Sequence, residues 1–220
     1  MLLKVENLQV AYGTHTVLQN VHLVLNAGEV MTICGRSGSG RSTLLKAIMG
    51  QVSSPSGVMS GAILYDNGKG LHNLSALPAY HRARLGIVRL PETKELFTEL
   101  TVEENLLLAL KACGLFPQAV WQTELNAVYE RYPILGTRAK VGAGVLSGGE
   151  QQLLAFARSM IVASKAKLFL LDEPAEGLAE AWVKMICEDL KRLQAEGKAI
   201  LMVEEKMQMS RKLEARVVTL

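Results

Sequence analysis

Cysteine is scarce in this chain, and the few cysteines stand far apart. Cys34, Cys113 and Cys187 are the three among 220 residues, and none of them has the spacing of a metal ligand. We therefore interpret them as reduced thiols. Thiols of this kind are typical of a reducing compartment, which favours the cytosol.

Long apolar runs are also missing, and the first residues do not predict a secretory leader. The apolar stretch at residues 153–163 is too short to span a bilayer and carries Arg158. Lys4 and Glu6 fall inside what would have to be the apolar core of a signal peptide. Any association with a membrane is therefore expected to come through a partner subunit.

Neither sign of charge dominates the sequence. The 24 basic and 21 acidic residues are interspersed and leave a net charge of +3, so no field is expected that would gather nucleic acid or anionic lipid. We predict no nucleic-acid partner. A hydrophobic fraction of 49% and a charged fraction of 20% exclude disorder, and the length fits one large domain with its own core.

The spacing of apolar residues predicts an α/β fold. Residues 2–10 and 17–25 alternate like a pair of antiparallel strands around the turn Gly13-Thr14. A short apolar strand, a glycine-rich loop and a helix follow over residues 29–49. Strand patterns at 168–171, 199–203 and 217–220 alternate with helical ones, which implies a parallel core sheet with right-handed crossovers.

The middle of the chain differs from its two ends in composition and in predicted structure. Residues 51–83 are rich in Gly, Ser, Asn and Pro and predict loop and edge structure, with one strand at 62–65. Helices are predicted over 101–112 and 118–131, the second ending at Pro133. Because these helices lie between the glycine-rich loop and the strand pattern at 168–171, we expect a helical subdomain inserted at about 93–160 into a single domain over 1–220.

A glycine-rich loop follows the strand that ends at Cys34. Backbone N–H groups of such a loop face inward as an anion nest, and the dipole of the following helix adds to it. The order of strand, loop and helix favours a phosphate-binding loop over a flexible Gly/Ser turn. Ser42 is expected to ligate Mg²⁺, and Thr43 to help hold the α-phosphate. The loop reads Gly35, Arg36, Ser37, Gly38, Ser39, Gly40, Arg41, Ser42 and Thr43.

Arg41 is the one departure from the phosphate-loop pattern, because lysine ordinarily stands there. Lysine is a compact point charge that reaches the β- and γ-phosphates, whereas arginine is a larger planar fork. The positive charge is kept, and the fit to the phosphates changes.

An acidic pair follows directly after the apolar strand at 168–171. Asp172 and Glu173 stand at its C-terminal end, where open α/β sheets bind their ligands. We predict that Asp172 holds Mg²⁺ through water and that Glu173 orients and activates the attacking water. A solvated turn is the alternative, and the upstream phosphate loop makes it a minor one.

The stretch 146–152 reads LSGGEQQ and begins a helix. Ser147 and Glu150 fit a capping box, which does not call for two consecutive glycines. LSGGEQQ resembles the signature sequence of ATP-binding cassettes (ABC). The resemblance covers nearly the whole chain, and it implies that Ser147, Gly148 and Gly149 close over the γ-phosphate bound by the opposite subunit.

The resemblance also implies roles for three further residues. Tyr12 stands where the family stacks an aromatic ring on adenine, although a core tyrosine is an alternative. Glu92 stands where most cassettes have a metal-contacting glutamine and the branched-chain amino-acid ATPases have glutamate. Glu205 stands at the switch position, where it has no donor for the γ-phosphate and is expected to repel Glu173.

The expected function is therefore that of an ABC ATPase subunit. The resemblance implies an importer of branched-chain amino acids or a related small polar solute, with MgATP hydrolysed at a dimer interface. It further implies permease subunits, a second identical or different ATPase subunit and, indirectly, a solute-binding protein, at the inner face of the cell membrane.

Two alternatives stay open. Arg41 and Glu205 suggest a partly degenerate regulatory subunit that binds nucleotide but hydrolyses it poorly. A P-loop kinase would leave LSGGEQQ unexplained. The sequence ends at Leu220, before the hairpin that usually follows the last strand of the family.

Overall fold

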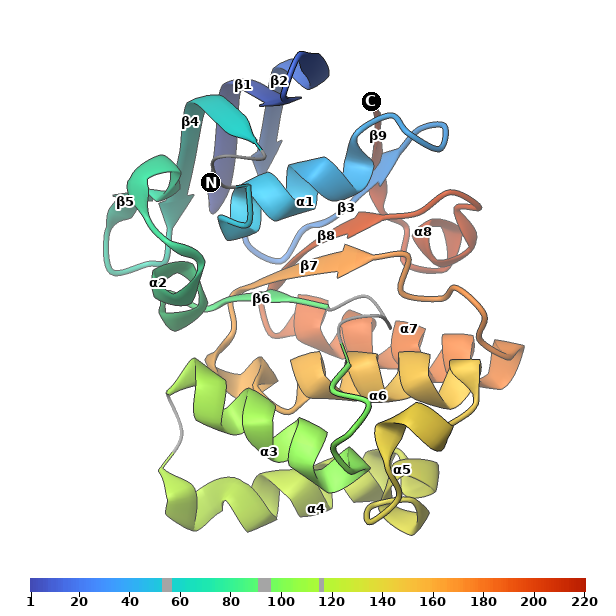
Figure 1. The fold of residues 1–220 in the computed structure, drawn as a ribbon. Coiled ribbons are helices and arrows are strands. Elements are labelled where there is room, and N and C mark those ends of the chain that lie inside the picture. Colours follow the sequence, from blue (N-terminus) through green and yellow to red (C-terminus); the bar gives the residue numbers. More distant parts are fainter. Residues whose placement is uncertain (53–56, 91–95, 115–116) are drawn as a thin grey trace.

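Two β-sheets share the strands of the chain, and helices lie around them (Figure 1). The structure is a computed structural model and describes residues 1–52, 57–90, 96–114 and 117–220. The smaller sheet is antiparallel and the larger one is parallel, as the sequence predicts.

The antiparallel sheet is built around the N-terminal hairpin. Strand β1 (Leu3–Tyr12) pairs with β2 (His15–Leu25), from Leu3 opposite Leu25 to Tyr12 opposite His15. Gly13 turns the chain between them with φ +58°. On its other side β1 pairs with β4 (Val58–Asp66), which pairs in turn with β5 (Leu71–Asn73).

The parallel sheet has the order β6-β7-β8-β3-β9. Because the pairings are parallel, the carboxyl ends of β3, β7 and β8 lie along one edge of the sheet, where ligands are expected. All residues of β7 and β8 are buried, and all of them except Asp172 at the end of β7 are apolar, so these strands do not alternate. The strands are β6 (Ile87–Arg89), β7 (Leu168–Asp172), β8 (Ala199–Val203), β3 (Val30–Cys34) and β9 (Arg216–Thr219).

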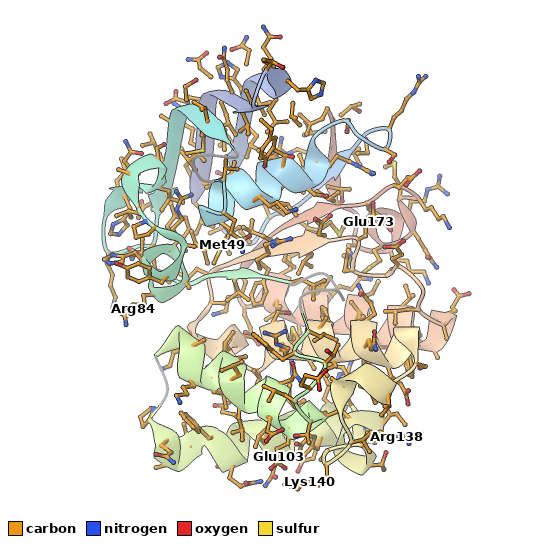
Figure 2. All side chains as sticks on the ribbon, viewed as in Figure 1. Met49, Arg84, Glu103, Arg138, Lys140 and Glu173 are labelled. Carbon is orange, nitrogen blue, oxygen red and sulfur yellow. The ribbon has the colours of Figure 1, made fainter. Side chains whose placement is uncertain are left out.

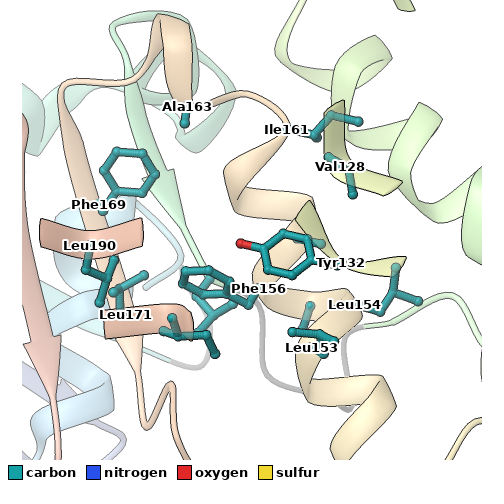
Figure 3. Close-up of a cluster of buried hydrophobic side chains, with 14 of the residues drawn as sticks. Val128, Tyr132, Leu153, Leu154, Phe156, Ile161, Ala163, Phe169, Leu171 and Leu190 are labelled. Carbon is teal, nitrogen blue, oxygen red and sulfur yellow. The ribbon is translucent and has the colours of Figure 1, made fainter. Parts of the chain in front are cut away.

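A hydrophobic core lies on each face of the parallel sheet. On one face, Leu168 and Leu170 pack with helix α1 (Arg41–Met49) and with the antiparallel sheet. On the other face, Phe169 and Leu171 pack with a second set of helices (Figure 3). That set comprises α3 (Val102–Cys113), α4 (Trp121–Arg131), α5 (Pro133–Thr137), α6 (Gly148–Met160), α7 (Glu180–Ala195) and α8 (Gln208–Lys212).

Two stretches differ from the sequence prediction. Residues 51–83 contain more regular structure than loop and one strand, namely a longer β4, β5 and the helix α2 (Ala79–Arg84). In the second stretch, a 3₁₀ turn at Gln118–Val120 precedes α4, and Pro133 begins α5. Proline fits there because the first turn of a helix needs no N–H from it.

Arg82 explains why α2 forms without a strong periodic signal. Its side chain is almost fully buried and donates hydrogen bonds to the carbonyls of Ala47 (2.8 Å), Ile48 (2.8 Å) and Leu77 (2.7 Å). The guanidinium thus satisfies carbonyls at the C-terminal end of α1. The helix is held by this contact, which local sequence does not reveal.

No helix in the described ranges is long and apolar enough to cross a bilayer. The limits of the inserted helical subdomain, at about 93–160, stay a prediction.

Candidate nucleotide site

The loop between β3 and α1 has a backbone that needs glycine. Gly38 and Gly40 have φ +82° and +92°, in the left-handed region. A Cβ added at Gly40 would lie 2.6 Å from Leu18 Cδ2. Helix α1 then begins at Arg41 with no side-chain cap on its first N–H groups, which leaves these donors available for an anion.

Ser42 and Asp172, the two predicted metal ligands that the structure describes, lie side by side. Ser42 Oγ donates to Asp172 Oδ1 at 3.1 Å, across 130 residues of sequence. A hydroxyl and a carboxylate are oxygen donors of the kind that Mg²⁺ takes, so the pair fits this metal in chemistry. Mg²⁺, when bound, neutralises charge that develops on the β- and γ-phosphate oxygens. Glu92, the third predicted ligand, lies outside the described residues.

Glu173 has a strained backbone with φ +45°. Its N–H donates to the Val203 carbonyl at 3.0 Å, and its own carbonyl accepts from Gln152 Nε2 at 3.2 Å. Such a conformation costs of the order of 1–3 kcal/mol and is held by its surroundings, often at functional sites. Burial raises the pKa of the Glu173 carboxyl, while the Glu205 N–H and Arg41 act against that rise. The carboxyl is thereby made a better base than an exposed glutamate.

Arg41 lies between the two glutamates that were expected to repel one another. Arg41 Nη1 is 3.4 Å from Glu173 Oε1, and Nη2 is 3.9 Å from Glu205 Oε2. The backbone N–H of Glu205 also donates to Glu173 Oε2 at 3.2 Å. The two departures from the family pattern thus meet in space, and the larger fork of Arg41 offsets the repulsion that Glu205 introduces. The sequence predicted only the repulsion, because pairing between positions 41 and 205 is a tertiary feature.

Arg89 is a residue of this site that the sequence analysis missed. It ends β6, beside β7, and its Nη2 is 4.0 Å from Asp172 Oδ2. Its Nη1 donates to Gln51 Oε1 at 2.8 Å. The signal was present in the sequence as an arginine within the short apolar run 87–90, where a charged side chain needs a buried partner.

The signature residues begin α6 as a capping box. Ser147 Oγ accepts from the Glu150 N–H at 3.3 Å, and Glu150 Oε2 accepts from the Ser147 N–H at 2.8 Å. Ser147 and Gly148 are exposed. A Cβ added at Gly148 would meet no heavy atom of the described residues within 4 Å, whereas at Gly149 it would lie 3.0 Å from Trp182 Cζ3. Packing within the described chain therefore explains the second glycine and not the first.

Comparison with known proteins decides the family. The ABC transporter family matches residues 18–176 of this chain. The chain belongs to the ABC transporter family. The prediction of an ABC ATPase with a P-loop NTPase fold is thereby confirmed, and the family couples ATP hydrolysis to transport.

Among relatives of this ABC ATPase are two branched-chain amino-acid proteins. It is 36% identical over 220 residues to the high-affinity branched-chain amino acid transport ATP-binding protein BraG of Pseudomonas aeruginosa, covering 100% of this chain and 88% of BraG. It is 34% identical over 208 residues to the probable branched-chain amino acid transport ATP-binding protein LivF of Archaeoglobus fulgidus, covering 94% and 83%. A solved ATP-binding subunit of an ABC transporter superposes with TM-score 0.82 at 28% identity, covering 97% of this chain and 83% of that chain.

The remaining predicted contacts of this ABC ATPase lie around the phosphate loop. Arg36 and Ser37 are exposed at its tip, while Gly35, Ser39 and Thr43 are half-buried. Tyr12 ends β1 as a half-buried ring packed near Val52, and a Cβ added at Gly57 would lie 3.1 Å from its Cε1. The ring therefore keeps an accessible part, as stacking on a base requires, and its contact with adenine stays a prediction.

Proposed function

We propose that this ABC ATPase is the nucleotide-binding subunit of an importer for branched-chain amino acids or a related small polar solute. The similarity to BraG and LivF over nearly the whole chain supports the substrate class. The phosphate loop, Asp172 and Glu173 support hydrolysis of MgATP, because they meet at the carboxyl edge of one parallel sheet. This convergence is the observation that carries the proposal.

Different residues of the chain bind the phosphates, hold the metal and activate the attacking water. Backbone N–H groups of residues 35–43 and the Arg41 guanidinium hold the phosphates. Ser42 and Asp172, with Glu92, would hold Mg²⁺, which would supply positive charge to the phosphates. Glu173 orients and activates the water that attacks the γ-phosphate.

The signature residues Ser147, Gly148 and Gly149 act on a second ATPase subunit. The Ser147 hydroxyl and the N–H groups of Gly148 and Gly149 close over the γ-phosphate in the site of that subunit. Gly148 supports this role, because no described residue of its own chain occupies the space beside it. Permease subunits at the inner face of the membrane and a solute-binding protein complete the assembly.

A regulatory subunit that holds nucleotide and hydrolyses it slowly is the second candidate. The pairing of Arg41 with Glu173 and Glu205 favours it, since the phosphates must displace both carboxylates from the guanidinium before it can hold them.

The test is ATP hydrolysis by the chain reconstituted with its permease and partner ATPase, driven by binding protein loaded with leucine. Glu173→Gln is compared with Glu176→Gln, an exposed glutamate three residues later. Loss of hydrolysis with Glu173→Gln alone supports a hydrolytic subunit. Unchanged hydrolysis with retained ATP binding favours the regulatory subunit, and absence of ATP binding contradicts both.

A further inference from the structure

We propose that Arg89 is a resident counter-ion of Asp172, so that nucleotide binding at this site depends little on Mg²⁺. The inference rests on the proposed function in one respect, namely that ATP occupies the phosphate loop. It concerns a residue that neither the phosphate-loop pattern nor the signature contains.

The sheet brings Arg89 to Asp172. Strand β6 lies next to β7 in parallel register, with Arg89 opposite Leu170, two residues before Asp172. The side chains of Arg89 and Asp172 are 4% and 5% exposed, and Nη2 lies 4.0 Å from Oδ2. Opposite charges at this separation interact far more strongly when buried than in water.

The two oxygens of Asp172 face different groups. Oδ1 accepts from Ser42 Oγ at 3.1 Å, while Oδ2 faces Arg89. A divalent cation beside Ser42 would have to share this carboxylate with a guanidinium. Two like charges on one carboxylate oppose each other, so the contribution of Asp172 to metal binding is reduced.

Contacts with neighbouring residues hold the Arg89 side chain in place. Gln51 Oε1 accepts a hydrogen bond from Arg89 Nη1 at 2.8 Å, and the guanidinium is buried beside Asp172. The side chain also lines a hollow of about 370 Å³ between the end of α1, β6 and the helices α3 and α6. Its positive charge is therefore a fixed part of the site.

Arg41 supplies a second cation close to the acidic pair, 3.4 Å from Glu173. Two guanidinium groups thus lie beside the acidic pair Asp172 and Glu173. Their charge partly neutralises the two carboxylates, so the nucleotide phosphates meet less repulsion here without a divalent ion.

The experiment is an equilibrium titration of the full chain with ATP, in excess MgCl₂ and in excess EDTA. For the unchanged chain we expect dissociation constants that differ by less than about threefold. For Arg89→Gln we expect Mg²⁺ to tighten binding by about tenfold or more, because Asp172 is then available to the metal. Arg84→Gln removes an exposed arginine at the end of α2 and should behave like the unchanged chain (Figure 2).

A second measurement needs no variant. Mn²⁺ binding, followed by electron paramagnetic resonance, should be less than about threefold tighter for the complex of chain and ATP than for free ATP.

The outcomes separate this inference from the proposed function. Retained ATP binding with a tenfold or greater metal dependence in the unchanged chain overturns the inference alone. The same holds if folded Arg89→Gln is as insensitive to Mg²⁺ as the unchanged chain, or if the complex binds Mn²⁺ about tenfold or more tightly than free ATP does. Absence of ATP binding under both conditions overturns the proposed function and the inference together.

Discussion

The phosphate-loop face and the signature face of this chain differ in how far their polar groups are already paired within the chain. On the first face, Arg41 and Arg89 lie close to Glu173, Glu205 and Asp172, so the charged groups of the site largely neutralise one another. On the second face, Ser147 and Gly148 are exposed beside open space. From this comparison we expect the chain to complete the site of another subunit more readily than its own.

The largest effect is expected from Ser147→Arg in a transporter that pairs this chain with a different, intact ATPase. Arginine at this position would block the γ-phosphate of the partner's site and lower ATP hydrolysis by about 100-fold or more. Glu173→Gln should lower it only partly, because it removes the slower of the two sites. Ser164→Arg, an exposed serine beyond the other end of α6, is the control.

Equal and complete loss from Ser147→Arg and Glu173→Gln would mean that the Arg41 site turns over normally. In a homodimer both sites carry Arg41 and Glu205, and slow hydrolysis at each is expected instead.

Glycine-to-alanine changes compare the two faces directly. Gly40→Ala places a Cβ 2.6 Å from Leu18 Cδ2 at φ +92° and should lower the free energy of unfolding by about 2–3 kcal/mol. Gly148→Ala meets open space in a helix and should change it by less than about 1 kcal/mol, in the stabilising direction. Urea denaturation of the isolated chain measures both. Similar losses for the two variants would remove this distinction between the faces.

The pairing of Arg41 with Glu205 predicts coupled effects on stability. Arg41→Gln leaves Glu173 and Glu205 facing one another, and we expect a loss of about 1 kcal/mol. Adding Glu205→Gln should recover about half of it. Arg36→Gln, at an exposed arginine of the same loop, should be neutral. Additive losses would show that the two departures from the family pattern are independent.

Tyr12→Ala should weaken ATP binding by about 1 kcal/mol and leave inorganic triphosphate binding unchanged, since stacking acts on the base alone. Parallel titrations with the two ligands test this. Equal losses for both would assign Tyr12 to the packing of β1 instead.

The smallest effect concerns pH. Burial raises the folded-state pKa of the Glu173 carboxyl, so the folded chain binds more protons than the unfolded chain between the ordinary and the raised pKa. Stability therefore falls as pH rises through that window, and the loss persists above it. Glu173→Gln should abolish this loss of stability, because glutamine does not titrate. The melting temperature of the variant, relative to that of the unchanged chain, should therefore increase as pH rises. A constant difference at all pH values would contradict this.

Local patterns in the sequence predict much of this structure. Alternation predicts β1 and β2, the apolar runs predict β3, β7 and β8, and the glycines predict the phosphate loop, because each signal depends on neighbouring residues. The same reasoning places Ser42 and Asp172 together, since parallel strands share an edge.

The missed features depend on contacts between residues far apart in the chain. Helix α2 forms around the Arg82 contact with α1, and Arg89 meets Asp172 although the two residues are 83 positions apart in the sequence. The ion pairs of Arg41 with Glu173 and Glu205 were missed for the same reason, because they join residues far apart in the sequence.

The strand order also determines when the parallel sheet can form during translation. Strand β3, which leads into the phosphate loop, has β8 and β9 as its neighbours, and β8 begins 165 residues after Cys34 (199 − 34). At ordinary rates of translation, roughly 10–30 s pass before the ribosome delivers that neighbour. During this interval the edges of β3 have no strand to pair with, and the loop has no settled sheet behind it. We expect nascent chains to acquire ATP binding abruptly, once β8 and β9 have emerged from the ribosome.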